Sequence, residues 1–231
     1  MQFLADGDFV GVSFWIVSVA MIASTVFFLY EGMNVKREWR LSLLIAGLVT
    51  LVAGVHYAYM RDYWVINQAT PIVYRYIDWL ITVPLLMIEF YIILKAVGAS
   101  VSSGSFMRLL GGTLVMLIFG YLGEAGVMNS TIAFWLGMVG WAIIIYEIFA
   151  GEASKLNANS GNIASQNAFK TIRLIVTVGW AIYPIGYFLG MGEANTSGTL
   201  DIVYNLADLV NKAAFGLAIW VAATSDSESV S

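Results

Sequence analysis

The sequence contains no cysteine and only one histidine, and these absences exclude several classes of protein. Without cysteine there is no disulfide framework, no thiol nucleophile and no cysteine-ligated metal. One histidine cannot build a histidine-rich metal site, so we expect no metal centre. The net charge of −4 comes without any basic cluster of the kind that binds nucleic acid, so we expect no nucleic-acid partner.

Charged residues are also scarce. They make up 11% of the 231 residues, whereas 60% are hydrophobic. A soluble domain carries roughly 25% charged residues, so this composition indicates a membrane protein. The N-terminus, MQFLADGDFV, lacks the basic region and cleavage site of a signal peptide, and we expect either a mature chain or one inserted by its first helix.

Seven apolar segments are long enough to cross a bilayer as helices, which takes about 20 residues each. They do not resemble the alternating strands of a membrane barrel. The Ser-, Asn- and Gly-rich stretch 151–167 is expected to be a solvated loop. We predict one all-α domain over residues 1–231, a seven-transmembrane-helix bundle. Its expected spans are 9–30, 41–60, 71–95, 106–122, 131–150, 169–190 and 200–223.

The basic residues predict the orientation. Eight of the eleven flank the first, third and fifth connections, and Arg61 alone flanks the other side. Loops rich in Lys and Arg stay in the cytoplasm. We therefore expect the N-terminus outside and the C-terminal TSDSESVS as a solvated cytoplasmic tail. The eight residues are Lys36, Arg37, Arg40, Lys95, Arg108, Lys155, Lys170 and Arg173.

Lys212 lies in the middle of the last span, with Asp208 one helical turn before it. A lysine at this depth costs roughly 2.5–3.5 kcal/mol on insertion scales, so it is rarely there without a function. The spacing of four residues places both side chains on one helix face. Two interpretations follow, a buried ion pair or an attachment point for a carbonyl-bearing cofactor through a Schiff base.

Five residues of the third span share one helix face, because they are spaced by 3, 4, 4 and 3 positions. They are Arg75, Asp78, Thr82, Leu86 and Glu89. Charged side chains on a membrane helix face the interior of a bundle. The alternative is a network that only orients helices, but polar groups with that role are usually uncharged.

The depths of these charged residues indicate a proton path. At 1.5 Å per residue from the outer ends, Asp78 lies roughly 10 Å deep, Asp208 about 12 Å, Lys212 about 18 Å and Glu89 about 27 Å. Two carboxylates therefore lie outside the lysine nitrogen and one lies inside it. The outer acid can take a proton from the nitrogen and the inner acid can return one from the cytoplasm, an order that predicts export.

Two motifs, RYIDW followed by Thr82 and Glu89 in the third span and DLVNK in the seventh, resemble the microbial rhodopsins. Among these the chain is similar to the proteorhodopsins of marine bacteria, over essentially its whole length. The resemblance implies all-trans retinal bound to Lys212 by a Schiff base, with the helices packed around a retinal pocket. It also implies a light-driven outward proton pump, multi-pass in a bacterial inner membrane. The length leaves no room for an appended cyclase or kinase, so we expect no enzyme activity.

The resemblance assigns roles to the charged residues. It implies that Asp78 is the primary counterion and proton acceptor, Asp208 the second counterion and Glu89 the cytoplasmic proton donor. Arg75 matches the arginine below the Schiff base. His56, in an HY pair, resembles a hydrogen-bond partner of the counterion aspartate, although a histidine satisfied within the core is the alternative.

Aromatic side chains are expected to wall the retinal pocket, although an interfacial belt is the default alternative for membrane tryptophans. Leu86 occupies the position where green-absorbing members carry leucine and blue-absorbing members glutamine, so we predict green absorption. The expected pocket residues are Trp79, Thr82, Leu86, Met116, Gly120, Trp141, Trp180, Tyr183 and Tyr187.

The resemblance also bears on partners. It implies a homo-oligomer, pentamer or hexamer, in the lipid bilayer. Phe134 lies where carotenoid-binding relatives carry a small glycine, so no carotenoid antenna is expected. The outer loop acids Glu193 and Asp201 lack the spacing of the archaeal proton-release pair. The alternative function is a sensory photoreceptor that signals through a membrane partner, but a sensor needs no fast cytoplasmic donor such as Glu89.

Overall fold

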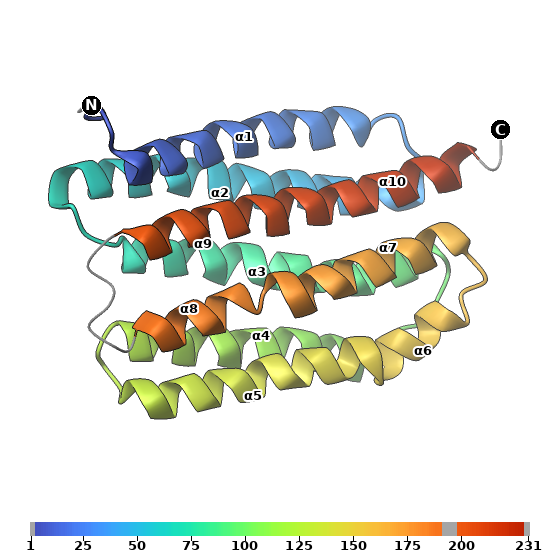
Figure 1. The fold of residues 1–231 in the computed structure, drawn as a ribbon. Coiled ribbons are helices and arrows are strands. Elements are labelled where there is room, and N and C mark those ends of the chain that lie inside the picture. Colours follow the sequence, from blue (N-terminus) through green and yellow to red (C-terminus); the bar gives the residue numbers. More distant parts are fainter. Residues whose placement is uncertain (1–2, 191–197, 229–231) are drawn as a thin grey trace.

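The computed structural model describes residues 3–190 and 198–228, which form a bundle of lengthwise helices (Figure 1). Seven helical stretches are long and apolar enough to cross a membrane. No β-strand occurs within the two described ranges. The predicted seven-helix bundle is therefore confirmed. The two ends of the chain lie at opposite ends of the bundle.

Four spans are single helices and three consist of shorter pieces. The single helices are α1 (Phe9–Glu31), α2 (Arg40–Asn67), α3 (Ile72–Ala96) and α4 (Ser103–Glu124), with a short 3-10 turn, η1 (Arg37–Trp39), before α2. The fifth span is α5 (Ser130–Phe149) continued by α6 (Glu152–Ala158). The sixth comprises α7 (Ile163–Leu174), the π-helical turn η2 (Ile175–Gly179) and α8 (Ile182–Gly190). The seventh comprises α9 (Thr199–Leu209), the π-helical turn η3 (Val210–Ala214) and α10 (Phe215–Glu228).

Two predicted connections are helical instead. Helix α2 continues past Arg61, which is buried and pairs with Asp62 at 3.1 Å. The stretch 151–167, expected to be a solvated loop, contains α6 and the start of α7. Here the buried Glu147 carboxylate accepts a hydrogen bond from the Ala153 amide at 3.0 Å, which satisfies a free N–H in the first turn of α6.

The predicted solvated tail is wrong for residues 224–228, which complete α10. The Asp226 carboxylate accepts hydrogen bonds from Trp39 Nε1 at 3.0 Å and Asn162 Nδ2 at 2.7 Å. It also lies 3.3 Å from Lys36 Nζ. These contacts hold the end of the seventh span against η1 and the start of α7.

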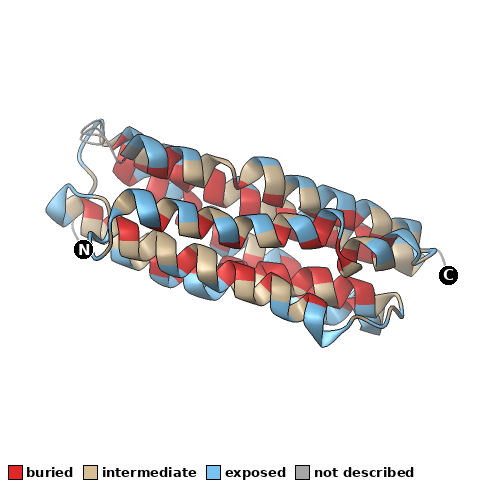
Figure 2. Cartoon of the chain, turned by 90° about the horizontal axis from the view of Figure 1, so that it is seen from below, coloured by how far each residue is buried: buried red, intermediate tan, exposed pale blue. Residues whose placement is uncertain are grey.

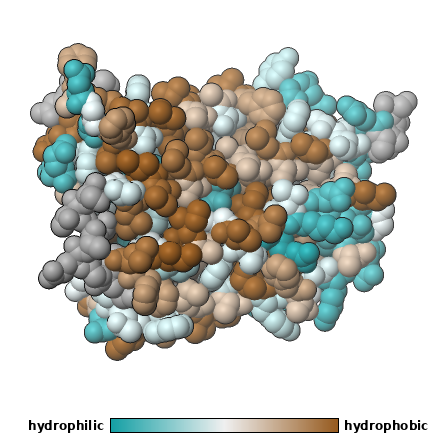
Figure 3. Space-filling model, viewed as in Figure 1, coloured by the Kyte–Doolittle hydropathy of each residue, from teal (hydrophilic) through white to brown (hydrophobic). Residues whose placement is uncertain are grey.

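The outer surface of the bundle is apolar. Figure 2 shows buried residues along the inward faces of the helices and exposed residues along the outward faces. Large apolar side chains such as Trp135, Ile185 and Phe188 are more than half exposed. Figure 3 shows apolar residues over the middle of one face, with polar residues gathered towards the end that carries the C-terminus. This distribution suits hydrocarbon surroundings, and the chain is a multi-pass membrane protein.

Towards the same end of the bundle the interior is packed with aromatic rings. The Phe90 ring contacts Phe169 edge-on at 5.0 Å between centroids and Phe215 at 6.1 Å. All three rings are at most 1% exposed. Edge-to-face rings at this spacing are favourable packing, and they join α3, α7 and α10 into one core.

Candidate functional site

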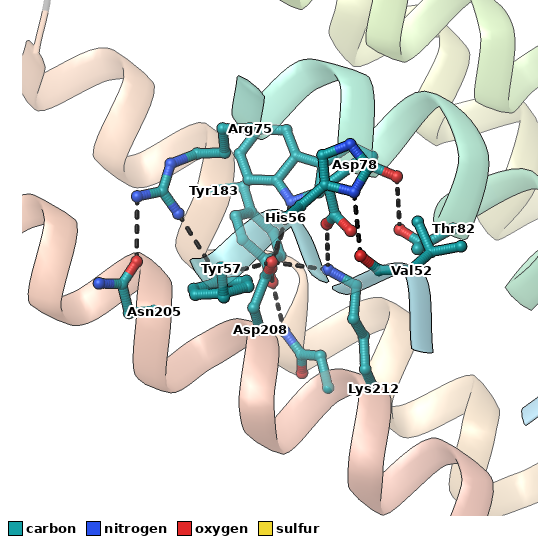
Figure 4. A network of polar contacts seen from close by, with 12 residues as sticks. Val52, His56, Tyr57, Arg75, Asp78, Thr82, Tyr183, Asn205, Asp208 and Lys212 are labelled. Carbon is teal, nitrogen blue, oxygen red and sulfur yellow. Dashed lines mark hydrogen bonds and ion pairs between the residues drawn. The ribbon is translucent and has the colours of Figure 1, made fainter. Parts of the chain in front are cut away.

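Lys212 makes two buried ion pairs at the centre of the bundle (Figure 4). Its Nζ lies 2.7 Å from Asp78 Oδ2 and 2.6 Å from Asp208 Oδ2. All three residues are at most 3% exposed. Asp208 is placed by the four-residue helix spacing, whereas Asp78 comes from α3, 134 residues away along the chain. The amine is thus held between two carboxylates.

Lys212 belongs to one of two π-helical turns that lie against each other. Asn211, its neighbour in η3, donates hydrogen bonds to the Gly179 carbonyl of η2 at 3.1 Å and to the Tyr183 hydroxyl at 3.2 Å. A Cβ on Gly179 would lie only 2.1 Å from Asn211 Oδ1, so glycine permits this contact. Such turns are frequent at functional sites, and here they fix the direction of the lysine.

The two aspartates are held differently. Asp208 accepts hydrogen bonds from the Tyr57 hydroxyl at 2.8 Å, the Tyr183 hydroxyl at 2.5 Å and Trp79 Nε1 at 3.2 Å. In contrast, Asp78 Oδ1 has no hydrogen-bond partner in the described ranges. Hydrogen bonds to a carboxylate favour its ionised form. Three side chains thus donate to Asp208, whereas Asp78 keeps one oxygen without a partner in the described ranges.

Thr82 and His56 lie next to Asp78 in ways that differ from the predictions. The Thr82 hydroxyl donates to the Asp78 carbonyl at 2.9 Å, a bond to the main chain of its own helix. The His56 ring is beside Asp78 (Figure 4), but its Nδ1 bonds to the Val52 carbonyl at 2.9 Å. The expected hydrogen bond to the aspartate is therefore wrong in this structure. Within the described ranges Asp78 Oδ1 has no partner and Asp78 Oδ2 bonds to Lys212, so neither carboxylate oxygen is bonded to the imidazole.

Arg75 points away from Asp78 and pairs with another acid. Its Nη2 lies 2.9 Å from Asp201 Oδ1 and 3.0 Å from Asn205 Oδ1. On the side that faces Lys212, Arg75 Nη1 donates a hydrogen bond to the Tyr57 hydroxyl at 3.5 Å. Arg75 and Asp201 are each 1% exposed, so this ion pair is as buried as that of the lysine.

The buried position of Asp201 differs from the expectation that it is an outer loop acid. Asp201 lies in the first turn of α9 and is buried. Its spacing of seven residues from Asp208 places both on one helix face, a signal that could have revealed it. Glu193, the other acid considered, lies outside the described residues.

A cavity with mostly apolar walls opens beside Lys212. Every predicted pocket residue except Thr82 lines it. Gly120 is needed for close packing, because a Cβ there would lie 2.8 Å from the Tyr76 hydroxyl. A primary amine at the end of such a cavity can condense with the aldehyde of an elongated apolar molecule, and the two carboxylates would balance the resulting charge. Lining residues that the sequence did not predict include Tyr76, Leu117, Glu124, Phe134, Met138, Pro184, Tyr204 and Asn211.

Glu89 is buried in the apolar half of α3. It is 0% exposed, and neither carboxylate oxygen makes a hydrogen bond within the part of the chain that the structure describes. The Ser42 hydroxyl faces it from α2. Eleven residues of helix, about 16 Å, separate it from Asp78. An uncompensated buried carboxyl is costly when ionised, so Glu89 is suited to carry a proton.

Comparison with known proteins agrees with this geometry. Residues 8–226 match the family model described as bacteriorhodopsin-like protein. The chain is 50% identical to the green-light absorbing proteorhodopsin of Gamma-proteobacterium EBAC31A08, across 97% of this chain and 90% of that protein. It is 48% identical to the blue-light absorbing proteorhodopsin of Gamma-proteobacterium Hot 75m4, across 95% of this chain and 88% of the relative.

A solved structure shows the same fold. The crystal structure of blue light-absorbing proteorhodopsin from Med12 is 54% identical and superposes with a TM-score of 0.83. The match covers 95% of this chain and 100% of that one. The family match and these identities confirm the resemblance seen in the motifs, and the chain belongs to the bacteriorhodopsin-like family and, within it, to the proteorhodopsins.

Proposed function

We propose that this protein is a light-driven outward proton pump that carries all-trans retinal on Lys212. The observation that carries the proposal is the Lys212 amine held between Asp78 and Asp208 at 2.7 and 2.6 Å, at the end of an aromatic cavity. The light absorption for which its relatives are named supports the proposal.

The residues around the cavity fit this cofactor. Bound as a Schiff base, retinal would supply a polyene that absorbs visible light and a charged nitrogen whose proton becomes transferable after isomerisation. Trp79 and Trp180 contribute rings to the cavity wall, and Tyr183 packs against Trp79 at 5.2 Å. Rigid rings on several sides restrict how a bound molecule can move.

Asp78 and Asp208 divide two tasks between them. Asp78 accepts the proton from the Lys212 nitrogen, because it has a free oxygen and lies at hydrogen-bond distance. Asp208 stays ionised, because Tyr57, Tyr183 and Trp79 all donate to it. The acceptor lies on the outer side of the nitrogen in the proposed orientation, so the transfer moves a proton outwards.

Glu89 returns a proton from the cytoplasmic side. In Glu89→Gln we expect the colour to be retained and reprotonation of the Lys212 nitrogen to slow by about 100-fold, the lower end of the range for a positioned proton donor. Flash spectroscopy at neutral pH measures this rate. The matched control is Glu38→Gln, an exposed carboxyl expected near the same side of the membrane. An unchanged photocycle in Glu89→Gln would remove Glu89 from this role.

Illumination of cells supplied with retinal tests the function as a whole. We expect the medium to acidify in the light, and a protonophore to abolish the change. The sensory alternative predicts a coloured protein without light-dependent acidification. A protein that stays colourless with retinal would contradict both functions and leave the lysine as a structural ion pair.

Leu86 supports absorption in the green. It lines the cavity and is 3% exposed, so it presents an apolar surface to the bound molecule. We expect Leu86→Gln to move the absorption maximum to shorter wavelength, because an amide dipole there opposes the shift of charge on excitation. Leu85→Gln, one position earlier and outside the cavity lining, is the control. A maximum already in the blue for the wild type would contradict the assignment.

The remaining features of the proposal concern placement. We propose that residues 1–231 form one domain in a bacterial inner membrane, with the N-terminus outside and the C-terminus in the cytoplasm. The excess of basic residues in the first, third and fifth connections supports this orientation. The resemblance further supports a homo-oligomer of five or six copies without a carotenoid antenna, and a protein that transports rather than catalyses.

A further inference from the structure

The buried ion pair between Arg75 and Asp201 is not used by the mechanism above. Arg75 Nη2 lies 2.9 Å from Asp201 Oδ1, and the Thr70 hydroxyl donates to the other oxygen, Oδ2, at 2.7 Å. Asn205 accepts from the same guanidinium nitrogen at 3.0 Å. Both oxygens of the acid are thus engaged, and the position of the guanidinium is fixed.

This arrangement directs the charge of Arg75 away from the lysine. Within the described ranges Arg75 forms an ion pair with Asp201 and none with Asp78 or Asp208. Its link to the inner site is the Tyr57 hydroxyl, 3.5 Å from Nη1, which itself donates to Asp208. Asp201 therefore competes with the inner carboxylates for one cation.

The pair also lies at the boundary between two cavities. Arg75 and Asp201 line a second, outer cavity together with Thr70, whereas Asp208 and Lys212 line only the inner one. Glu124, Tyr187 and Tyr204 line both. A small movement of the guanidinium would transfer its charge from the outer cavity towards the inner site.

We infer that Asp201 is a positioning residue, which holds Arg75 away from Asp78 and so sets the pH at which Asp78 binds a proton in the dark. The inference rests on the proposed function. Other ionisable and charged groups also face Asp78, and their contacts do not involve Asp201 directly. They are His56 and Tyr57 of α2, Asp208 of α9 and Lys212 of η3.

Two changes in Asp201→Asn shift the pH at which Asp78 binds a proton, and both shift it in the same direction. Asp201→Asn removes a negative charge and releases the guanidinium to approach Asp78. Each change favours the ionised form of Asp78, so protonation then requires a lower pH. Asp201 lies seven residues, about 10 Å along the helix, from Asp208, and the Asp208 carboxylate shares the Lys212 Nζ with Asp78 at 2.6 and 2.7 Å. A unit charge at that distance shifts a buried titration by about one pH unit.

The test is a visible-absorption pH titration of retinal-reconstituted protein. We expect the midpoint of the colour change to fall by about one pH unit in Asp201→Asn. Asp201→Glu, which retains the charge, should restore most of the wild-type midpoint. An unchanged midpoint in Asp201→Asn would overturn the inference.

A double-mutant comparison separates positioning from simple charge. In an Arg75→Gln background there is no guanidinium to release, so the Asp201→Asn shift should fall to less than half of its value. Equal shifts in both backgrounds would show that Asp201 acts only through its own charge, which contradicts a positioning role.

Two further outcomes are informative. If Asp201→Asn does not fold, Thr70→Val is the second variant, because it removes the hydroxyl that donates to Asp201. We expect it to lower the midpoint of the titration by a smaller amount. An unchanged midpoint in Thr70→Val would also overturn the inference. A wild-type protein that stays colourless would remove the proposed function and this inference together. If the wild type is coloured but Asp201→Asn has the same titration midpoint, the inference alone is overturned and the proposed function stands.

Discussion

Lys212→Ala is expected to abolish both the colour and the light-driven transport of the retinal-supplied protein. Among the residues that line the inner cavity, Lys212 provides the primary amine. The other lysines, Lys36, Lys95, Lys155 and Lys170, do not line it. A Schiff base needs that amine, so the loss should be complete. Visible absorption and external pH under illumination measure the two effects.

Two controls sharpen this prediction. Lys170→Ala removes an exposed lysine and should leave colour and transport unchanged. Retinal condensed beforehand with ethylamine should restore colour to Lys212→Ala, because Asp78 and Asp208 remain to balance its charge. Circular dichroism shows whether the helices persist in the variant. A Lys212→Ala protein that still binds retinal aldehyde and turns coloured would disprove the attachment.

Asp78→Asn is expected to reduce transport to the level of the retinal-free protein while the protein stays coloured. The amide cannot accept the proton that we propose passes to Asp78 from the Lys212 nitrogen, which lies 2.7 Å from Asp78 Oδ2. Loss of a carboxylate beside a positive nitrogen also destabilises the ground state of the chromophore. The absorption maximum should therefore move to longer wavelength, in the direction opposite to that expected for Leu86→Gln.

The control for this variant is Asp62→Asn. The Asp62 carboxyl is 46% exposed and pairs with Arg61 at the outer end of α2. Its loss should change neither colour nor pumping, because Asp62 lines neither the inner nor the outer cavity. Continued acidification by Asp78→Asn would assign the acceptor role to another group, and Asp208 would be the next residue to test.

The features that can be predicted from the sequence are those where a residue type has a high free-energy cost in the wrong environment. Long apolar runs directly predict membrane spans. The charges at Asp78, Glu89 and Lys212 directly predict a polar site, because charged side chains in a span almost always face the interior of a bundle. The cavity walls followed from the resemblance to the proteorhodopsins, supported by the aromatic spacing in the sixth span. For these features local pattern and fold agree.

The rest depends on contacts between distant segments. The sequence predicts Asp201 as a loop acid because its partners, Thr70 and Arg75, lie 131 and 126 residues earlier in the chain. His56 is predicted to bond to Asp78, but its Nδ1 bonds to the Val52 carbonyl of its own helix instead. Asp226 lies in a polar stretch that resembles a tail in the sequence, but its bonds to Trp39 and Asn162, which are distant along the chain, hold it against the bundle.

The aromatic packing of Phe90, Phe169 and Phe215 has an electrical consequence. On that side of Lys212 the interior is apolar, whereas on the other side Tyr57, Arg75 and Asp201 form a polar chain. A membrane potential falls mainly across the less polarisable layer. The voltage in a working membrane, about 2.3 kcal/mol per charge for each 100 mV, would therefore act chiefly on the reprotonation step through Glu89. A large membrane potential would therefore slow the reprotonation of the Lys212 nitrogen more than the release of the proton to the outside.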